Sequence, residues 1–502
     1  MKSLRLFFLS LAVASALTAS AGPRQRTVSF AADTVRVLRN PLTGWVLYLG
    51  RNWDEQSYAR LHYDSIPTSD GSVVDVADYA TTCYLRTSWA SMEPEEGRYF
   101  WNDPQSRLYK LLQSMRDRGL RLAFRIVVDA RDQGQNTPLY VRDAGAWGFY
   151  DANNPKVWSP YPDDSVFQAK YAKFLKAFAG KFNDINVVSF IDAYGLGKWG
   201  EAHGVKYADY ANKHKVFDWI TSLYQHTFTN VPLIINYHRL VGDTISWAAP
   251  AADSDSLLCS AIAKGYSLRH DAFGMTDYYK QWERDFASRF LFRRPVIMEG
   301  GWITGGHHRY WRDSSGRYRE GHSEDVRAGE MADARQAHVN MMDFRIGDET
   351  VSWFGKAFSL VRQFVAHGGY RLYPSSVSYD TKVKAGGQLH VVSVWNNIGW
   401  GYCPTNIPQW HQKYKIGYAL RDSQGRIVKQ WTDAHSDLST WIQGNPVSNA
   451  AALPTQGLAR GRYHLLTALI DVGNGNPALE MAVSEDLLRD GWLDVGLLTL
   501  TR

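Results

Sequence analysis

Cysteine is scarce in this chain, and its scarcity excludes several kinds of fold. Cys83, Cys259 and Cys403 lie far apart in a sequence of 502 residues. So few cysteines exclude a small scaffold held by disulfides, and their spacing matches no metal-binding template. One disulfide with one free thiol is compatible with export. However, Cys83 lies inside an apolar, strand-like run, which favours buried free thiols. The fold must therefore draw its stability from its core.

Long apolar runs are missing after the first residues. Leu6 to Leu17 is apolar but too short to span a bilayer. It follows the basic residues Lys2 and Arg5 and precedes Ala19 to Ala21, which is the pattern of a cleaved signal peptide. We therefore expect residues 1–21 to direct export to the periplasm or the medium. No cysteine follows the cut, so we expect no lipid anchor, and the remaining chain is predicted to have no membrane span.

Several motifs of nucleotide and acyl chemistry are also absent. The formal net charge is +6 and no block of Lys and Arg stands out, which argues against a nucleic-acid partner. The sequence has no GxSxG elbow, so a serine α/β-hydrolase is excluded. No glycine-rich fingerprint follows the first predicted strand, so a dinucleotide cofactor is not expected. We predict no cofactor and no bound metal.

One polar loop contains several possible metal ligands. The segment 305–325 contains His307, His308, His322 and Asp325, which are residue types that bind metals. Their spacing fits no metal template. A substrate-facing loop or a solvated surface is the favoured interpretation.

Aromatic residues, by contrast, are abundant. The chain has 19 Trp, 28 Tyr and 21 Phe, which together make 14% of its residues. Aromatic faces stack on sugar rings, and carbohydrate sites are often lined with them. A large core that uses aromatic side chains would give the same composition. The composition therefore favours sugar binding without requiring it.

From residue 40 to about residue 370, short apolar runs alternate with helical patterns, which is typical of βα units around a parallel sheet. One helical face is clear in Phe167, Tyr171, Phe174, Leu175 and Phe178. Eight strands are predicted, at 44–49, 83–89, 122–128, 187–193, 232–237, 265–270, 295–299 and 350–354. Eight such units predict a closed (β/α)₈ TIM barrel over residues 22–373.

The pattern changes after Pro374. Strand-like runs at 389–397, 413–422, 462–471 and 492–500 are separated by Gly, Pro, Asn and Asp, with few helical stretches between them. We predict a small antiparallel β-sandwich over residues 374–502. No low-complexity linker precedes it, so the two parts are expected to pack together.

In a barrel, functional residues lie at the C-terminal ends of the strands. That rule selects Arg86, Trp89, Asp129, Asp192, Tyr237, His238, Asp271, Glu299 and Trp353. A glycosidase needs one carboxylic acid to protonate the leaving oxygen and a second carboxylate as nucleophile or base. Each acidic residue also has a structural interpretation as a helix N-cap or an ion-pair partner, and each Trp as a core residue.

At these positions the sequence resembles a known group of enzymes. The segment from Trp89 to Trp101 is similar to the one after strand two in clan A glycoside hydrolases, notably β-galactosidase-like families. Arg86 matches an arginine that the clan often carries there. Glu299, in PVIMEGGW, lies where the clan has its nucleophile, and Trp353 lies where a tryptophan often floors the sugar subsite. The resemblance implies a TIM barrel that cleaves glycosidic bonds.

The order of elements also resembles a group of secreted bacterial barrel proteins classified only as a domain of unknown function. That group carries a WGE segment after strand four and a (R/H)DxFG segment after strand six. The matching residues here are 199–201 and 270–274. The resemblance covers nearly the whole chain after the predicted signal peptide, but the group has no settled activity to transfer.

The strand-four motif departs from clan A, where the acid/base Glu directly follows an Asn at the strand end. Here Glu201 follows Gly200, eight residues after the predicted end of the strand at Ala193. Gly195, Gly197 and Gly200 would let this loop fold back over the site. Asp192, at the strand end itself, is the rival acid.

The leading hypothesis is therefore an exported glycoside hydrolase that retains anomeric configuration. Its nucleophile would be Glu299, with Glu201 or Asp192 as acid/base. Substrate contacts are expected from Arg86, Trp89, Asp129, Trp199, Tyr237, His238, Asp271, Trp302 and Trp353. The alternative is a non-catalytic carbohydrate-binding protein on a hydrolase-like barrel. A third hypothesis places sugar binding on Trp395, Trp400 and Trp410 of the β-sandwich, although core positions would explain these residues equally.

Overall fold

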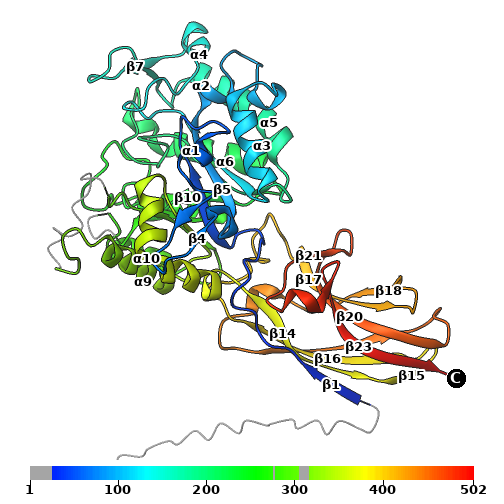
Figure 1. Cartoon of the computed structure of the whole chain (residues 1–502). Helices are drawn as coiled ribbons and strands as arrows, with labels where there is room; N and C mark the ends of the chain where they lie inside the picture. Colours follow the sequence, from blue (N-terminus) through cyan, green and yellow to red (C-terminus); the bar gives the residue numbers. More distant parts are fainter. Residues whose placement is uncertain (1–24, 275–277, 305–315) are drawn as a thin grey trace, which may run out of the picture.

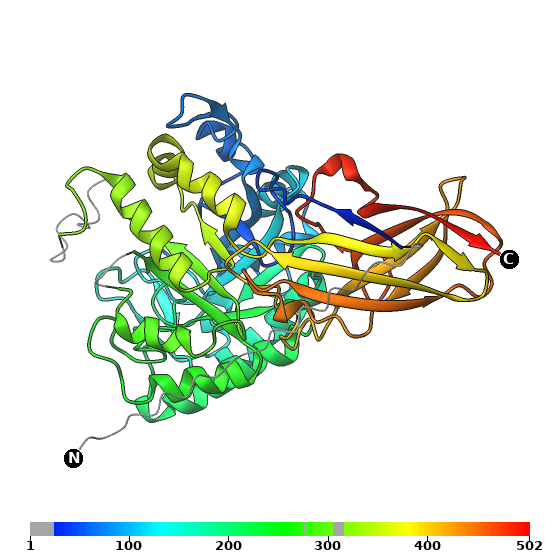
Figure 2. The same cartoon turned by 90° about the horizontal axis from the view of Figure 1, so that it is seen from below.

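The computed structural model describes residues 25–274, 278–304 and 316–502, and it contains two parts (Figure 1). A closed parallel barrel with surrounding helices forms the first, and two mainly antiparallel sheets form the second. Figure 2 shows the sandwich projecting from one side of the barrel, with the C-terminus at its far end. The predicted signal peptide and the residues His307 and His308 lie outside the described residues.

Eight parallel strands close the barrel in sequence order, each hydrogen-bonded to the next. The barrel strands are β2 (Gly44–Leu49), β5 (Ala80–Ser88), β6 (Arg121–Val127), β9 (Val188–Asp192), β10 (Leu233–Asn236), β11 (Ser267–Phe273), β12 (Val296–Gly300) and β13 (Met341–Asp343). β13 pairs with β2 and completes the closure. The predicted TIM barrel is confirmed, and seven of its strands lie where the apolar runs placed them.

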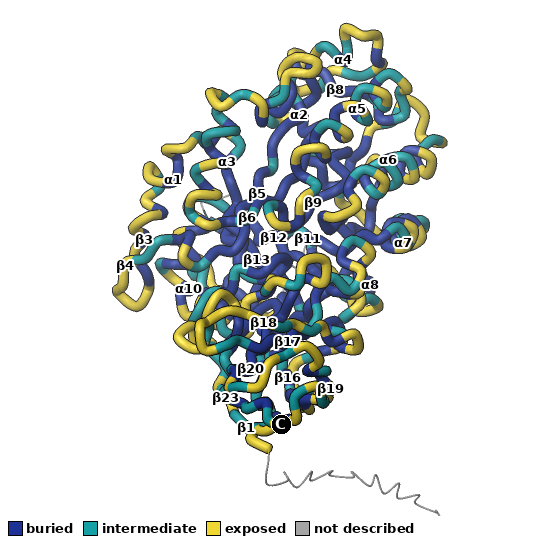
Figure 3. The backbone as a smooth tube through the Cα atoms, turned by 90° about the vertical axis from the view of Figure 1, so that its right-hand side faces the viewer, coloured by how far each residue is buried: buried dark blue, intermediate teal, exposed yellow. Residues whose placement is uncertain are grey.

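Helices surround the barrel and the longer ones bury one face, so the strands form the dark centre of Figure 3. The helices are α1 (Ser57–Arg60), α2 (Trp89–Met92), α3 (Arg107–Asp117), α4 (Leu139–Asp143), α5 (Ser165–Phe182), α6 (Lys213–Thr227), α7 (Ser254–Ala263), α8 (Gln281–Ser288), α9 (Ser323–Gln336) and α10 (Asp348–His367). The predicted aromatic face of α5 is buried. In the part of the chain that the structure describes, no helix is long and apolar enough to cross a membrane.

The prediction for strand eight was wrong. Thr350 to Phe354 lies in the first turns of helix α10, and the eighth strand is the three-residue β13. The run is rich in β-branched and aromatic residues, which favours a strand locally. However, Trp353, Ala357 and Val361 are spaced four residues apart and all point into the core, which is the helical period.

Two sheets form the sandwich, as predicted. One has the order β1 (Gln25–Ser29), β14 (Leu372–Asp380), β16 (Gln388–Asn397) and β19 (Val447–Pro454). The other contains β15 (Lys382–Lys384), β23 (Trp492–Thr501), β20 (Gly461–Asp471), β17 (Tyr414–Arg421) and β18 (Ile427–Thr432), joined at its margin by β21 (Pro477–Leu479) and β22 (Leu488–Arg489). Two short hairpins, β3 (Ile66–Pro67) with β4 (Val73–Val74) and β7 (Gly148–Tyr150) with β8 (Trp158–Pro160), decorate the barrel. Strand β1 was not foreseen, and it adds an N-terminal segment to this C-terminal unit.

The sandwich packs against the N-terminal ends of the barrel strands. Asn340, just before β13, donates from Nδ2 to the carbonyl oxygens of Leu42 and Tyr402 at 2.9 and 2.8 Å. The Trp400 indole donates to the Val339 carbonyl at 3.1 Å. One apolar cluster runs without interruption from the barrel interior into the sandwich. The opposite, C-terminal end of the barrel is therefore left for the loops.

All three cysteines are free, in line with the sequence-based prediction. Cys83 and Cys403 are buried, and Cys259 is half-buried. The tryptophans proposed for sugar binding on the sandwich, Trp395 and Trp410, are buried, as is Trp400 at the junction. Core packing explains all three.

Candidate active site

A cavity of about 440 Å³ opens at the C-terminal ends of the barrel strands. Its lining combines ionisable side chains with aromatic rings, and comprises Arg86, Asp132, Gln133, Trp199, Glu201, Trp247, Asp271, Ala272, Tyr278, Glu299, Gly300, Gly301, Trp302 and Arg345. Trp247 and Trp302 keep 46% and 41% of their surface exposed. Of the residues predicted from the sequence, Arg86, Trp199, Glu201, Asp271, Glu299 and Trp302 meet here.

The loop after β9 brings Glu201 to this cavity. Gly195, Gly197 and Gly200 have φ angles of +73°, +78° and +74°, a region that favours glycine. A Cβ at Gly195 would clash with the carbonyl oxygen of Ile126. Trp199 and Ala202, on either side of Glu201, also have positive φ, at 59° and 62°. Such backbone strain in non-glycine residues is often found at functional sites. The predicted fold-back of the loop is confirmed.

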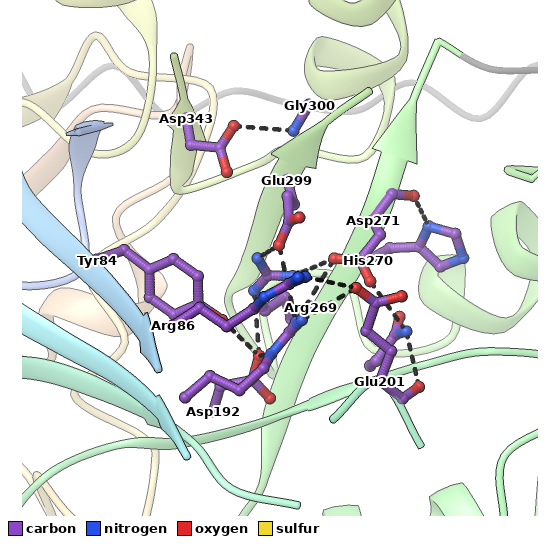
Figure 4. A network of polar contacts seen from close by, with 12 residues as sticks. Tyr84, Arg86, Asp192, Glu201, Arg269, His270, Asp271, Glu299, Gly300 and Asp343 are labelled. Carbon is purple, nitrogen blue, oxygen red and sulfur yellow. Dashed lines mark hydrogen bonds and ion pairs between the residues drawn. The ribbon is translucent and has the colours of Figure 1, made fainter. Parts of the chain in front are cut away.

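Three carboxylates converge in the cavity. One oxygen each of Glu201, Asp271 and Glu299 lies within 4.8 Å of the other two. They come from the β9–α6 loop, from β11 and from β12, so three separate elements bring them together (Figure 4). Oxygen ligands at this spacing are also the type that hard divalent cations prefer. Here, however, guanidinium groups already neutralise them.

Two buried arginines lie beneath the carboxylates. Arg125, in the middle of β6, is within 2.5 Å of Asp192, 3.2 Å of Glu201, 3.6 Å of Asp271 and 3.7 Å of Glu299. Side chains alternate along β6, so Leu122, Phe124 and Ile126 pack outward while Arg125 points inward. The barrel interior at this level is thus a charged layer rather than an apolar one.

The second buried arginine, Arg269 of β11, forms ion pairs with Glu299 and Asp271 and lies 3.4 Å from Asp192. Buried charges are tolerated only when they are paired and hydrogen-bonded. Each carboxylate of the layer meets at least one guanidinium. Tyr84 supplies a further donor, because its hydroxyl lies 3.1 Å from Asp192.

Glu299 is 1% exposed and is held from the cavity side by Arg345. The Arg345 guanidinium also lies 4.6 Å from the Trp302 ring and 4.9 Å from the Tyr48 ring. One face of Trp302 is therefore covered by a cation. Arg86 donates to Glu201 Oε1 at 3.2 Å and to Gln133 Oε1 at 3.1 Å.

A second buried network fixes the loop that carries Trp302. Glu330 accepts the backbone N–H of Gly301 at 2.9 Å. Glu349 accepts the N–H groups of Ile303 and Thr304 at 2.7 and 2.8 Å. Arg327 lies between the two carboxylates and pairs with both. Trp302 is thus presented on a backbone segment with little freedom.

Burial and neighbouring charge shift several pKa values around the site. The guanidinium groups of Arg269 and Arg125 outweigh the effect of burial on Asp271 and hold its pKa below the usual range. Burial raises the pKa of Asp343, at the end of β13, to about 8, and raises that of Glu330 to about 7. The carboxylate that faces the cavity at β11 is therefore ionised, while the pKa values of the two buried acids behind it lie at or just above neutral pH.

Other predicted polar residues lie near the cavity without lining it. Asp192 is buried under the arginine layer. Asp129 pairs with Arg131 at 2.7 Å and accepts from Ser159 at 3.0 Å. Tyr237 and His238 are buried in an aromatic group with His270. Of the loop residues considered for metal binding, His322 pairs with Glu324 and Asp325 with Arg319.

Two predicted tryptophans belong to the core. Trp89 opens helix α2, is buried against Tyr171 and Phe174, and donates its indole N–H to Glu93. Trp353 belongs to helix α10 and packs against Trp45. Neither residue is among those that line the cavity. The strand-end rule selected Trp89 because it directly follows β5, and Trp353 because strand eight was misplaced.

Sequence reasoning missed Arg125, Arg269, Arg345, His203 and Trp247. Two of these had a signal in the sequence. Arg125 stands in the centre of an apolar strand and Arg269 in the run before Asp271, where a lone cation requires a buried partner. Arg345 was missed because strand eight was misplaced. His203 and Trp247 have no comparable signal, because tertiary contacts position their loops.

Comparison with known proteins identifies no family for this chain. No protein-family model matches the chain. No curated protein matches it. Among solved structures, the catalytic domain of the β-amylase from Paenibacillus polymyxa is 12% identical, covers 65% of this chain and 98% of its own length, and has a TM-score of 0.43.

Two further solved structures are similarly distant. The glycoside hydrolase family 30 subfamily 8 xylanase from Clostridium acetobutylicum is 14% identical, covers 85% of this chain and 96% of its own, and has a TM-score of 0.37. A β-galactosidase from G. stearothermophilus is 13% identical, covers 66% of this chain and 57% of its own length, and has a TM-score of 0.35. At such identities and scores, function has to be argued from the site itself.

Proposed function

We propose that the protein is a glycoside hydrolase that cleaves an oligo- or polysaccharide with retention of anomeric configuration. The observation that carries the proposal is the close pair Glu201 and Glu299, whose nearest oxygens lie within 4.8 Å at the mouth of the barrel. Retaining glycosidases need carboxyl groups about 5 to 5.5 Å apart, whereas inverting enzymes leave about 6.5 to 9.5 Å for a water. The spacing supports retention.

Glu299 has the properties of the nucleophile. Arg269, Arg345 and Arg125 surround its carboxylate, and opposite charges at this range favour the ionised form. In the first step the Glu299 carboxylate attacks the anomeric carbon as the bond to the leaving oxygen breaks. In the second step water displaces Glu299 from the sugar.

Glu201 is the better candidate for acid/base than Asp192. Glu201 lines the cavity, whereas Asp192 is buried and lies 2.5 Å from Arg125. Glu201 would protonate the leaving oxygen in the first step and take a proton from water in the second. Asp271, with its ionised carboxylate on the cavity wall, would accept hydrogen bonds from sugar hydroxyls.

The aromatic lining supports a carbohydrate substrate. Trp302 and Trp247 are large, half-exposed rings on loops from β12 and β10, and Trp199 lies on the loop that carries Glu201. Such rings stack on the apolar face of a sugar while carboxylates take its hydroxyls. In keeping with the predicted signal peptide, we propose that the protein is exported and meets its glycan in the periplasm or the medium.

A non-catalytic carbohydrate-binding protein is the second candidate. The observation that favours it is the pairing of Glu201 Oε1 with both Arg86 and Arg125 at 3.2 Å, because adjacent cations oppose the protonated form that a general acid needs. The same cavity would then hold a sugar without cleaving it.

One experiment distinguishes the enzyme from the non-catalytic binding protein. The mature protein, Glu299→Gln and Glu201→Gln are incubated with a panel of plant, host and microbial glycans and aryl glycosides, and binding is measured by calorimetry in parallel. If the protein is the proposed enzyme, the wild type releases sugar, whereas both variants lose turnover and still bind the glycan. Binding by all three proteins with release by none identifies the binding protein.

A further inference from the structure

We propose that His203 is a positioning residue that stores the proton which Glu201 delivers. This inference rests on the proposed glycosidase function. His203 stands two residues after Glu201 in the same folded-back loop and is 1% exposed. Its Nε2 lies 3.4 Å from Glu201 Oε2, and its Nδ1 lies 3.0 Å from the Ser246 hydroxyl. The ring is thus fixed between the acid and a loop of the next βα unit.

The two oxygens of Glu201 have different surroundings. Oε1 accepts hydrogen bonds from the guanidinium groups of Arg86 and Arg125 and is therefore already occupied by donors. Oε2 is the remaining site, and in the part of the chain that the structure describes its ionic partner is His203. A carboxylate that must carry a proton next to two cations needs a nearby donor, and the imidazole is placed to be one.

The other groups around His203 do not compete for this role. The His238 ring centre lies 4.6 Å away, but burial holds the His238 pKa well below its usual range, so this imidazole is neutral. Its Nδ1 accepts from the Leu240 N–H. The Trp247 and Trp199 rings lie 5.2 and 6.4 Å from His203, and the Lys198 ammonium lies over Trp199. The charged groups nearest to the Glu201–His203 pair are Arg86 and Arg125, each 3.2 Å from Glu201, followed by the carboxylates of Asp271 and Glu299 within 4.8 Å.

The proton transfer balances without any further reactant. The resting pair is a Glu201 carboxylate with a His203 imidazolium. The Nε2–H bond breaks as an O–H bond forms at Oε2, which leaves neutral imidazole with its Nδ1–H donated to Ser246. Glu201 then gives the proton to the leaving oxygen. In the second step a proton from the attacking water returns to Oε2 and passes back to Nε2.

The test compares leaving groups. Wild type, His203→Gln, Ser246→Ala and His238→Gln are assayed on two glycosides of one sugar, one with an activated aryl leaving group and one with an alkyl leaving group. General acid catalysis contributes about 10²- to 10⁴-fold and matters most for the poor leaving group. His203→Gln should lose at least about tenfold in kcat/KM on the alkyl glycoside and much less on the aryl one. Ser246→Ala should also lose more kcat/KM on the alkyl glycoside than on the aryl one, with a smaller loss than His203→Gln.

The pH profile provides the second readout. His203→Gln removes the site on which the pair stores its shared proton, so the alkaline limb of kcat/KM should move to lower pH in this variant. His238→Gln, a buried neighbour that does not contact Glu201, should affect both leaving groups equally. Ser246→Ala carries the test if His203→Gln fails to fold.

Equal losses on both glycosides, or an unmoved alkaline limb, would overturn the proposal for His203. If wild type still shows turnover that depends on Glu299, the proposed glycosidase function survives that result. If wild type cleaves no glycoside, the proposed function fails first and this inference fails with it.

Discussion

At the scale of single residues, the site is a layer of paired charges inside an otherwise apolar barrel. Arg125 and Arg269 are buried among Asp192, Asp271 and Glu299. Transfer of these charges from water into the protein interior costs free energy. The arrangement is stable only where every charge has a partner. Here it places two carboxylates side by side at the cavity.

Removal of one buried cation should therefore destabilise the protein strongly. Arg269→Met leaves Glu299 and Asp271 with a missing partner, and loss of one member of a buried pair costs about 3 to 5 kcal/mol. Urea denaturation measures the change. Arg319→Met is the control, because its pair with Asp325 is exposed on the arginine side and such surface ion pairs contribute little to stability. Similar losses in the two variants would contradict the account.

Asp343 should make stability depend on pH. Burial raises its pKa from 3.8 to about 8, so the folded protein holds a proton that the unfolded chain has lost over that range. Its stabilising contribution is complete below about pH 4 and is lost as pH rises through about 8. Asp343→Asn keeps the acceptor for the Gly300 N–H but does not titrate. We expect wild type to lose stability relative to Asp343→Asn between pH 5 and pH 8.

Urea denaturation of both proteins at about pH 5 and pH 8 tests this expectation. A difference in unfolding free energy that stays constant between the two conditions would show that Asp343 is ionised in the folded state throughout.

Sequence alone identified the residues that stand at strand ends, but not those that hold them. Glu201, Asp271 and Glu299 follow from the barrel rule and from motif resemblance. Arg125 and Arg269 are visible as cations in apolar strands, but their partners depend on which strands become neighbours. The pairing of Arg86 with Glu201 rather than Glu299 depends on how far one loop folds back, which residue types do not encode.

At the scale of elements, the β9–α6 loop determines the geometry of the site. Gly195 has φ of +73° and no space for a Cβ beside the Ile126 carbonyl. Gly195→Ala should therefore lower both stability and kcat/KM, because the loop that carries Glu201 must move. Gly97→Ala is a matched control, since Gly97 has φ of +82° with open space around it.

Thermal unfolding and kinetics of the two glycine variants separate steric clash from backbone strain. Backbone strain alone should lower the free energy of unfolding by about 1 kcal/mol in each variant. Gly195→Ala should exceed that loss and reduce turnover, while Gly97→Ala should keep full turnover. Equal behaviour of the two would mean that the loop tolerates the clash.

Element prediction succeeded where patterns were long and failed where one was short. Seven barrel strands and helix α5 follow directly from apolar periodicity. Strand β13 has three residues, too few to show a period, while the start of helix α10 reads locally as a strand. Strand β1 joins the sandwich by pairing with β14, hundreds of residues later in the chain, and such a contact leaves no local signature.

At the scale of the whole molecule, the barrel and the sandwich share one core. Leu42 and Tyr370 at the base of the barrel belong to the same buried cluster as Trp395 and Leu465 of the sandwich. Asn340 ties the two parts with hydrogen bonds on both sides. The sandwich thus covers apolar surface at the end of the barrel opposite the cavity.

This shared core predicts cooperative unfolding. Calorimetry should show one transition, with the calorimetric enthalpy equal to the van't Hoff enthalpy. Deletion of residues 374–502 should leave an aggregating barrel, because its apolar base would be exposed. Two resolved transitions, or a soluble and folded deletion variant, would show that the parts are independent domains.

We propose that Glu201 and Glu299 form the close-set carboxylate pair of a retaining glycosidase. The most direct measurement is the anomeric configuration of the first sugar released, followed by proton NMR before mutarotation. We expect the released sugar to have the same anomeric configuration as in the substrate, and we expect Glu299→Gln to release none. An inverted product would mean that a water fits between the carboxylates, and release by Glu299→Gln at the wild-type rate would place the chemistry elsewhere.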